Sequence, residues 1–206
     1  RFVDPLGLQA TFPGLTVTFD SSCSDSVPID LTAAQQNAVA KSISDACTTF
    51  QNALRNLALI PSYQPNLGHE KTKKKQLTAD NNLNRLNNIL TTALKEGCGS
   101  LTVECECACN PGVHAYTRGD VWGSWASLHL CPLFSSTTAG EQAKTILHEL
   151  THYGDSEDDV ADDLNAHNLE HLLPWLEGIA PPPPPPSNSS ALSSVAPVSG
   201  QSQTGK

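Results

Sequence analysis

The most informative spacing in this chain lies in the stretch Thr145-Ile146-Leu147-His148-Glu149-Leu150-Thr151-His152-Tyr153. Helix positions four apart lie on the same face, so His148 and His152 can bind one ion together. Glu149 follows the first histidine, where its carboxylate can reach a water molecule on that ion. Two neutral imidazoles with a neighbouring carboxylate form the helical half of a zinc peptidase site. The motif therefore predicts Zn²⁺ ligands at His148 and His152 and a general base at Glu149.

The alternative is a chance occurrence of the motif in a polar helix. Ile146, Leu147 and Leu150 are apolar at positions that favour a half-buried helix, which the zinc interpretation requires. A catalytic zinc site also needs a third protein ligand and one open position for water. The acidic run from Asp155 to Asp163 offers carboxylates for this role, and Glu170 lies further along. Spacing alone leaves Asp and Glu both open.

Composition limits the class of protein and its partners. The net charge of -9 argues against nucleic acid and against an anionic membrane surface. No stretch approaches the roughly twenty apolar residues of a membrane helix. The chain starts at Arg1 with no Met and no leader-like run, which indicates a processed or truncated mature form. We expect a secreted, extracellular monomer that acts on protein or peptide substrates.

The chain divides into three parts. Residues 1–30 contain several Pro and Gly around a short alternating run, which predicts an extended arm with one strand. Residues 31–178 are long enough for one domain with its own core. Residues 179–206 begin with six consecutive prolines and continue with Ser, Asn and Gly, which predicts a disordered tail.

Periodicity predicts an α+β fold that is mainly helical and has a small antiparallel sheet. A helix starts at the N-cap Thr32, with Gln35 three residues on, and ends before Pro61. A loop is expected from Pro61 to Lys75. The last expected helix, over residues 159–173, is expected to end at Pro174. The other expected helices cover residues 78–96, 140–153 and 159–173, and the expected strands cover residues 101–105, 113–117 and 127–131.

Seven cysteines favour a disulfide-stapled, secreted chain over a thiolate zinc site. Cys105, Cys107 and Cys109 recur at every second position, which suits an extended strand better than a zinc knuckle. One bridge between Cys47 and Cys98 could join the first two helices, although several connectivities are possible. The odd number leaves one cysteine outside the intrachain pairs. The seven are Cys23, Cys47, Cys98, Cys105, Cys107, Cys109 and Cys131.

Residues 105–170 resemble the aspzincin peptidases, that is, deuterolysin and the fungal peptidyl-Lys metalloendopeptidases. The resemblance rests on several motifs in series over about a third of the chain. They are Cys105-Glu106-Cys107, His114-Ala115-Tyr116, Leu130-Cys131-Pro132-Leu133-Phe134 and the HExxH helix. It implies a zincin-like fold and a secreted zinc endopeptidase with one Zn²⁺ per chain.

The resemblance also implies an Asp as the third zinc ligand. If the family's Asp-x-Ala is aligned with this sequence, the ligand is Asp159. If the family's Thr is aligned with Ser156, the ligand is Asp158 instead. We expect Asp159, with Asp158 as the alternative. Asp162 stands where the family has the Tyr thought to stabilise the oxyanion, and Tyr116 or Tyr153 is a candidate replacement. Glu170 corresponds to an acidic residue that contacts the substrate's Lys, so it is a candidate S1′ contact.

Two further expectations concern the disulfides and the function. The family's disulfides imply Cys23–Cys105 and Cys107–Cys131, which leaves Cys47–Cys98 as the helical staple and Cys109 unpaired. The family's Gly-Thr and Tyr-Gly pieces are absent, and the connection after His152 is short. A non-catalytic zinc-binding secreted protein on the same scaffold is therefore the alternative function. A Cys-rich metal module without the His site is a third hypothesis, and it predicts several free thiols.

Overall fold

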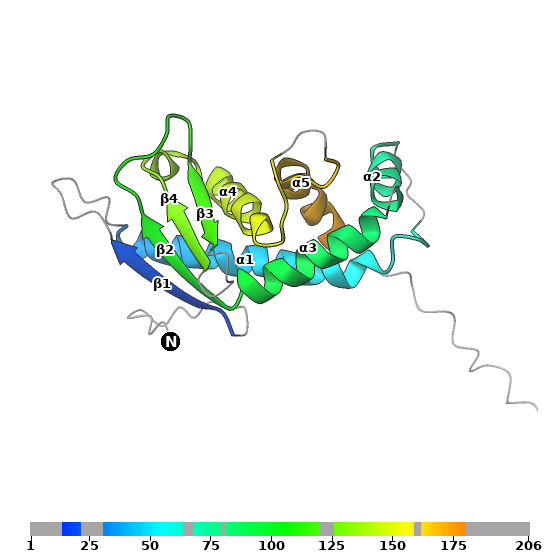
Figure 1. Cartoon of the computed structure of the whole chain (residues 1–206), viewed down its shortest axis with the longest axis horizontal. Coiled ribbons are helices and arrows are strands. Elements are labelled where there is room, and N and C mark those ends of the chain that lie inside the picture. Colours follow the sequence, from blue (N-terminus) through cyan, green and yellow to red (C-terminus); the bar gives the residue numbers. More distant parts are fainter. Residues whose placement is uncertain are drawn as a thin grey trace, which may run out of the picture.

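The computed structural model describes residues 14–21, 31–63, 68–79, 81–119, 126–158 and 162–179. These form five α-helices, one 3₁₀ turn and a four-stranded sheet that lies toward one end of the molecule (Figure 1). The elements are β1 (Thr16–Ser21), α1 (Ala33–Leu57), α2 (Gly68–Thr78), α3 (Asn82–Glu96), β2 (Ser100–Cys105), β3 (Ala115–Gly119), β4 (Ala126–Leu130), the 3₁₀ turn (Phe134–Ser136), α4 (Ala139–His152) and α5 (Ala166–Glu177).

The sheet is mixed, so the expectation of an antiparallel sheet is wrong. Its strand order is β1-β2-β4-β3; the β1–β2 and β2–β4 pairs are parallel, and β3–β4 is antiparallel. A parallel pair needs a long crossover connection, which α1, α2 and α3 supply between β1 and β2. The short strand in the predicted N-terminal arm is thus an edge strand of this sheet. The opposite edge is β3, which packs beside α4.

Helix α1 is the central element of the helical part. Its start is confirmed, because Thr32 and Gln35 form the expected capping box. It packs against α3, α4 and α5 and runs along much of the length of the described fold (Figure 1). Its core-facing side chains include Ile43, Cys47 and Phe50, which are fully buried. None of the described helices is both long and apolar enough to cross a membrane.

Two local expectations are wrong. Part of the expected loop between Pro61 and Lys75 belongs to α2, whose one core side chain, Leu77, is fully buried. The last helix differs at both ends, because α5 begins at Ala166 instead of near residue 159, and Pro174 lies inside it instead of ending it. A proline in a helix loses one backbone hydrogen bond, and here the burial of Leu172, Leu173 and Leu176 offsets that loss.

The disulfides differ from those the resemblance implied, except for one. The Cys47–Cys98 staple is confirmed. Cys131 pairs with Cys109, so the expected Cys107–Cys131 bridge and the unpaired Cys109 are both wrong.

The states of Cys105 and Cys107, the other two cysteines of this segment, also differ from the expected pairing. Cys105 is a buried thiol, which contradicts the expected Cys23–Cys105 bridge, and Cys107 is disulfide-bonded. Alternation along β2 explains the thiol, because it turns Cys105 into the core with Leu101 and Val103. Cys23, most of the arm and residues 180–206 lie outside the described residues, so expectations about them stay predictions.

Candidate metal centre

Helix α4 presents the HExxH motif at its C-terminal end. Thr138 and Glu141 form a capping box that starts the helix, and Ile146 and Leu150 anchor it in the core. His148 and His152 lie on one face, with their ring centroids 5.1 Å apart. His148 is 9% exposed, so the helix carries this imidazole at the boundary between the core and the surface.

The turn after α4 brings the acidic run back toward the two histidines. Gly154 packs so closely on α3 that a Cβ at this position would lie 2.4 Å from the carbonyl oxygen of Ile89. Ser156 then fixes the returning chain: its hydroxyl donates to Thr151 Oγ1 at 2.7 Å, and its carbonyl lies 2.6 Å from His152 Nδ1. These two contacts place Asp158 beside the motif helix.

One carboxylate and two imidazoles converge at this point. Asp158 Oδ1 lies 3.3 Å from His148 Nε2 and 3.8 Å from His152 Nε2. One ligand atom from each of these three residues lies within 4.8 Å of the others. Nδ1–H of His152 donates to the Ser156 carbonyl, so the lone pair on its Nε2 faces Asp158. Two imidazoles and one carboxylate are donors that Zn²⁺ prefers, so the residues fit this ion.

Glu149 is buried beside this group. Its side chain faces β3, where the Thr117 N–H hydrogen-bonds its carboxylate. Burial, followed by the negative charge of Asp158, raises the pKa of Glu149 to about 8, while the Thr117 bond opposes the shift. Burial and the neighbouring His152 lower the pKa of His148, which favours the neutral imidazole that a metal ligand requires.

Helix α5 contributes Glu170 and His167 to the same region. Glu170 Oε2 lies 3.6 Å from His148 Nδ1, and its other oxygen pairs with Lys144 Nζ at 2.9 Å. His167 Nε2 lies 3.8 Å from Asp158 Oδ1, and its ring centroid is 4.6 Å from that of His148. A second group of potential ligands, His148, His167 and Glu170, therefore adjoins the first.

Two clefts flank the converging residues and share Glu149 and Asp158. The cleft on the His152 side has a volume of about 650 Å³ and reaches Tyr116 and Thr117 of β3. The cleft on the His148 side has a volume of about 580 Å³ and reaches Lys144, His167 and Glu170. His148, His152 and Asp158 thus lie between two hollows that both reach Val113 and Ala115, just before and at the start of β3.

The two tyrosines considered for the oxyanion role use their hydroxyl groups elsewhere. The Tyr116 hydroxyl donates to Glu106 at 2.8 Å, and its ring stacks on His129. The Tyr153 hydroxyl donates to the Ser127 carbonyl at 2.8 Å. Burial and the nearby Glu149 raise the pKa of Tyr153.

The structure brings together the sequence-derived candidates His148, Glu149, His152, Asp158 and Glu170. Asp159, the expected third ligand, lies outside the described residues, and its role stays a prediction. Sequence reasoning missed three contributions: the Ser156 carbonyl, the Thr117 N–H and the approach of His167 to Asp158. The position of Ser156, four residues after His152, was a usable signal, whereas the other two depend on tertiary packing.

Neither a model of a known protein family nor a curated protein matches this sequence. Among solved structures, the chain is similar to a zinc peptidase from Grifola frondosa, with 17% sequence identity and a TM-score of 0.46. The alignment covers 69% of this chain and 95% of that chain. Similarity at this level carries no argument about function, so the proposal below rests on the residues of the metal centre.

Proposed function

We propose that this protein is a secreted zinc-dependent endopeptidase of the aspzincin kind, with His148, His152 and Asp158 as its zinc ligands. The observation that carries the proposal is the convergence of these three side chains next to the buried Glu149. Asp158 takes the place of the expected Asp159 in the proposal because its carboxylate faces both imidazoles. The disulfides support an oxidising, extracellular setting.

Glu149 is the proposed general base. Zn²⁺ at such a site lowers the pKa of a bound water molecule and polarises a carbonyl group. Glu149 would accept the proton of that water and pass it to the leaving amine. Thr117 orients the carboxylate through its backbone N–H. The positive charge of a bound Zn²⁺ would oppose the rise in the pKa of Glu149 and favour the ionised carboxylate that a general base requires.

The β3 edge and the two clefts support an extended peptide as substrate. An edge strand presents unpaired backbone N–H and C=O groups, to which a peptide can add as a further strand. Glu170 lines the cleft on the His148 side and remains our candidate for the S1′ contact. Because Lys144 already pairs with this carboxylate, we expect no strict preference for Lys in the substrate.

The substitution Glu149→Gln tests the proposal in a casein digest. We expect proteolysis to fall by at least about 100-fold, because a general base contributes 10²–10⁴-fold, while one Zn²⁺ still binds at this centre. The matched control is Glu96→Gln, which removes a carboxylate at the end of α3 that lines neither cleft and should leave proteolysis unchanged. Chelation should abolish wild-type activity, and added Zn²⁺ should restore it. Retained proteolysis in Glu149→Gln would refute the mechanism.

The approach of His167 favours a second candidate function, a non-catalytic zinc-binding protein. Three imidazole Nε2 atoms lie 3.3 to 3.8 Å from the same oxygen of Asp158. A fourth protein ligand at His167 would close the position that a catalytic zinc site keeps open for water. This alternative predicts that the zinc-loaded wild type leaves casein intact. It also predicts that His167→Ala changes the visible spectrum of the Co²⁺-substituted protein.

A further inference from the structure

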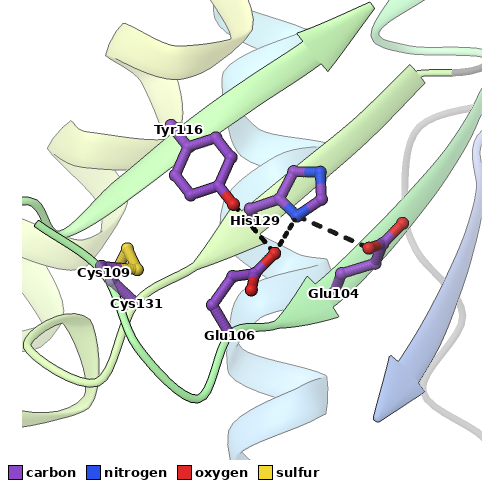
Figure 2. Close-up of a disulfide and its surroundings, with 6 residues drawn as sticks. All are labelled: Glu104, Glu106, Cys109, Tyr116, His129 and Cys131. Atoms are coloured by element: carbon purple, nitrogen blue, oxygen red, sulfur yellow. Dashed lines mark hydrogen bonds and ion pairs between the residues drawn. A yellow bond between two sulfur atoms is a disulfide. The ribbon is translucent and has the colours of Figure 1, made fainter. Parts of the chain in front are cut away.

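A separate cluster of potential metal ligands, away from both groups around His148, lies on the opposite face of the sheet from the core. Alternation along β4 turns Leu128 and Leu130 into the core and His129 to the other face. There His129 meets Glu104 of β2 and Glu106, which directly follows β2 (Figure 2). None of these residues belongs to the metal centre described above.

The geometry of this cluster is that of a tripod. His129 Nδ1 lies 2.7 Å from Glu106 Oε1 and 3.5 Å from Glu104 Oε2. One ligand atom from each of the three residues lies within 4.8 Å of the others. Bonds of about 2.1 Å in a tetrahedral zinc site separate the ligand atoms by about 3.4 Å. The distance from His129 Nδ1 to Glu104 Oε2 already matches this value. The distance from Nδ1 to Glu106 Oε1 would have to increase by about 0.7 Å.

The surrounding residues hold the imidazole and one carboxylate in place. His129 is 2% exposed, and its Nε2 lies 2.8 Å from Ser127 Oγ. Tyr116 stacks on the imidazole at a centroid distance of 4.6 Å, and its hydroxyl donates to Glu106 at 2.8 Å. A metal-binding histidine typically has its other nitrogen fixed by such a partner. His129 therefore presents Nδ1 to the two carboxylates in one defined orientation.

The Cys109–Cys131 disulfide ties the segment that carries Glu106 to the end of β4 (Figure 2). Cys109 lies three residues after Glu106, and Cys131 lies two residues after His129. The bridge thus restrains the distance between the Glu106 segment and the strand of His129. A site assembled from two strands gains preorganisation from such a link.

Of the two carboxylates in this cluster, Glu106 accepts hydrogen bonds and Glu104 has no donor among the described residues. A single Nδ1–H can serve Glu106, but among the described residues Glu104 receives no hydrogen bond, and its nearest charged partner is Nδ1 at 3.5 Å. Two carboxylates side by side repel each other. A divalent cation bound here would neutralise both charges and take the place of the proton on Nδ1, and Nε2–H would then donate to Ser127 Oγ.

We propose that Glu104, Glu106 and His129 form a second metal site, for a divalent transition-metal ion such as Zn²⁺. Imidazole together with carboxylates suits Zn²⁺ or Mn²⁺ better than Ca²⁺, whose ligands are oxygen atoms. This site is independent of the proposed peptidase function, and it adds a second ion to the one expected per chain.

Calorimetric titration with ZnCl₂ alone, and separately with MnCl₂, tests the proposal. The full chain carries His148→Ala and His152→Ala, which remove the first centre. We expect this double variant to bind one Zn²⁺ per chain. Adding Glu104→Gln should weaken that binding at least tenfold. The matched control adds Glu96→Gln, which removes one negative charge at the end of α3 and should leave the affinity unchanged.

Nitrogen NMR of His129 in the otherwise wild-type chain provides a second readout. We expect added Zn²⁺ to shift the Nδ1 resonance of His129 and to leave the proton on Nε2. Glu104 has a partly exposed side chain (31%), so Glu104→Gln should keep the fold, which circular dichroism can verify. The proposal fails if the double variant binds no Zn²⁺ or Mn²⁺, if Glu104→Gln binds as tightly as Glu96→Gln, or if the His129 resonances do not move. The cluster is then a hydrogen-bonded ion pair only.

Discussion

At the scale of single residues, Asp158 is the least anchored of the three proposed zinc ligands. Its side chain is 58% exposed, whereas those of His148 and His152 are held on a packed helix. The contacts that position it come from its neighbour Ser156, through Thr151 and His152. The identity of the third ligand is therefore the residue-level question that mutation can answer most directly.

The substitution Asp158→Asn should weaken zinc binding at the first centre by more than about 100-fold. Changes in outer-shell partners already cost about 10–100-fold, and this change removes a direct ligand charge. Asp155→Asn is the matched control, because Asp155 has a left-handed backbone (φ 60°) that Asn also tolerates. Competition with a zinc chelator measures the affinities. If Asp159→Asn alone loses the zinc, Asp159 is the ligand and the assignment to Asp158 is wrong.

At the scale of elements, the turn between α4 and the returning acidic segment depends on its contact with α3. Gly154→Ala should destabilise the fold by about 1–3 kcal/mol, the usual cost of overpacking, because the new Cβ collides with the Ile89 backbone. Gly140→Ala in α4 meets no atom within 4 Å and should stabilise by up to about 1 kcal/mol. Urea unfolding measures both changes. Equal effects of the two substitutions would contradict this packing.

The ion pair between Arg85 of α3 and Asp162 before α5 should make stability depend on pH. The Arg85 hydrogen bond holds the pKa of Asp162 below its usual value. A lowered folded-state pKa contributes stability above the unfolded pKa of about 4, and this stability is lost as the pH falls through the folded value.

Asp162→Asn should therefore cost up to about 1 kcal/mol at pH 7, a small value because the pair is partly exposed. The difference from wild type should shrink steadily below about pH 4. Unfolding curves at a series of pH values measure it. A difference that stays constant down to pH 2 would show that the Asp162 charge makes no contribution.

At the scale of the whole molecule, the Cys47–Cys98 disulfide joins α1 to the end of α3 across 51 residues of chain. Replacing both cysteines by Ala should cost about 2–5 kcal/mol, because the unfolded chain regains the freedom that this crosslink removes. Denaturant unfolding of the double variant, with zinc binding as a check on the native fold, measures the loss. An unchanged free energy of unfolding would mean that the packing of α1 on α3 alone holds these helices together.

Much of the fold follows from local sequence patterns. The Thr32–Gln35 capping box, the apolar stripe of α1 and the HExxH helix appear where periodicity predicted them, because helix formation depends on neighbours three and four residues apart. Strands β2, β3 and β4 also lie within two residues of their predicted positions. The sequence did not predict which of these strands pair in parallel, because parallel and antiparallel strands share the same alternation of side chains.

The candidate metal centre likewise has one part that local sequence predicts and another that depends on tertiary packing. The placing of His148 and His152 on one helix face, with Glu149 next to them, follows from the four-residue spacing, because this geometry is local. Three other features depend on how distant segments pack: Asp158 faces both imidazoles, Thr117 holds Glu149, and Cys109 rather than Cys107 bonds to Cys131. These contacts join different segments, and packing of the turn after α4 on α3 and of β3 beside α4 sets their distances. Sequence spacing does not encode such distances.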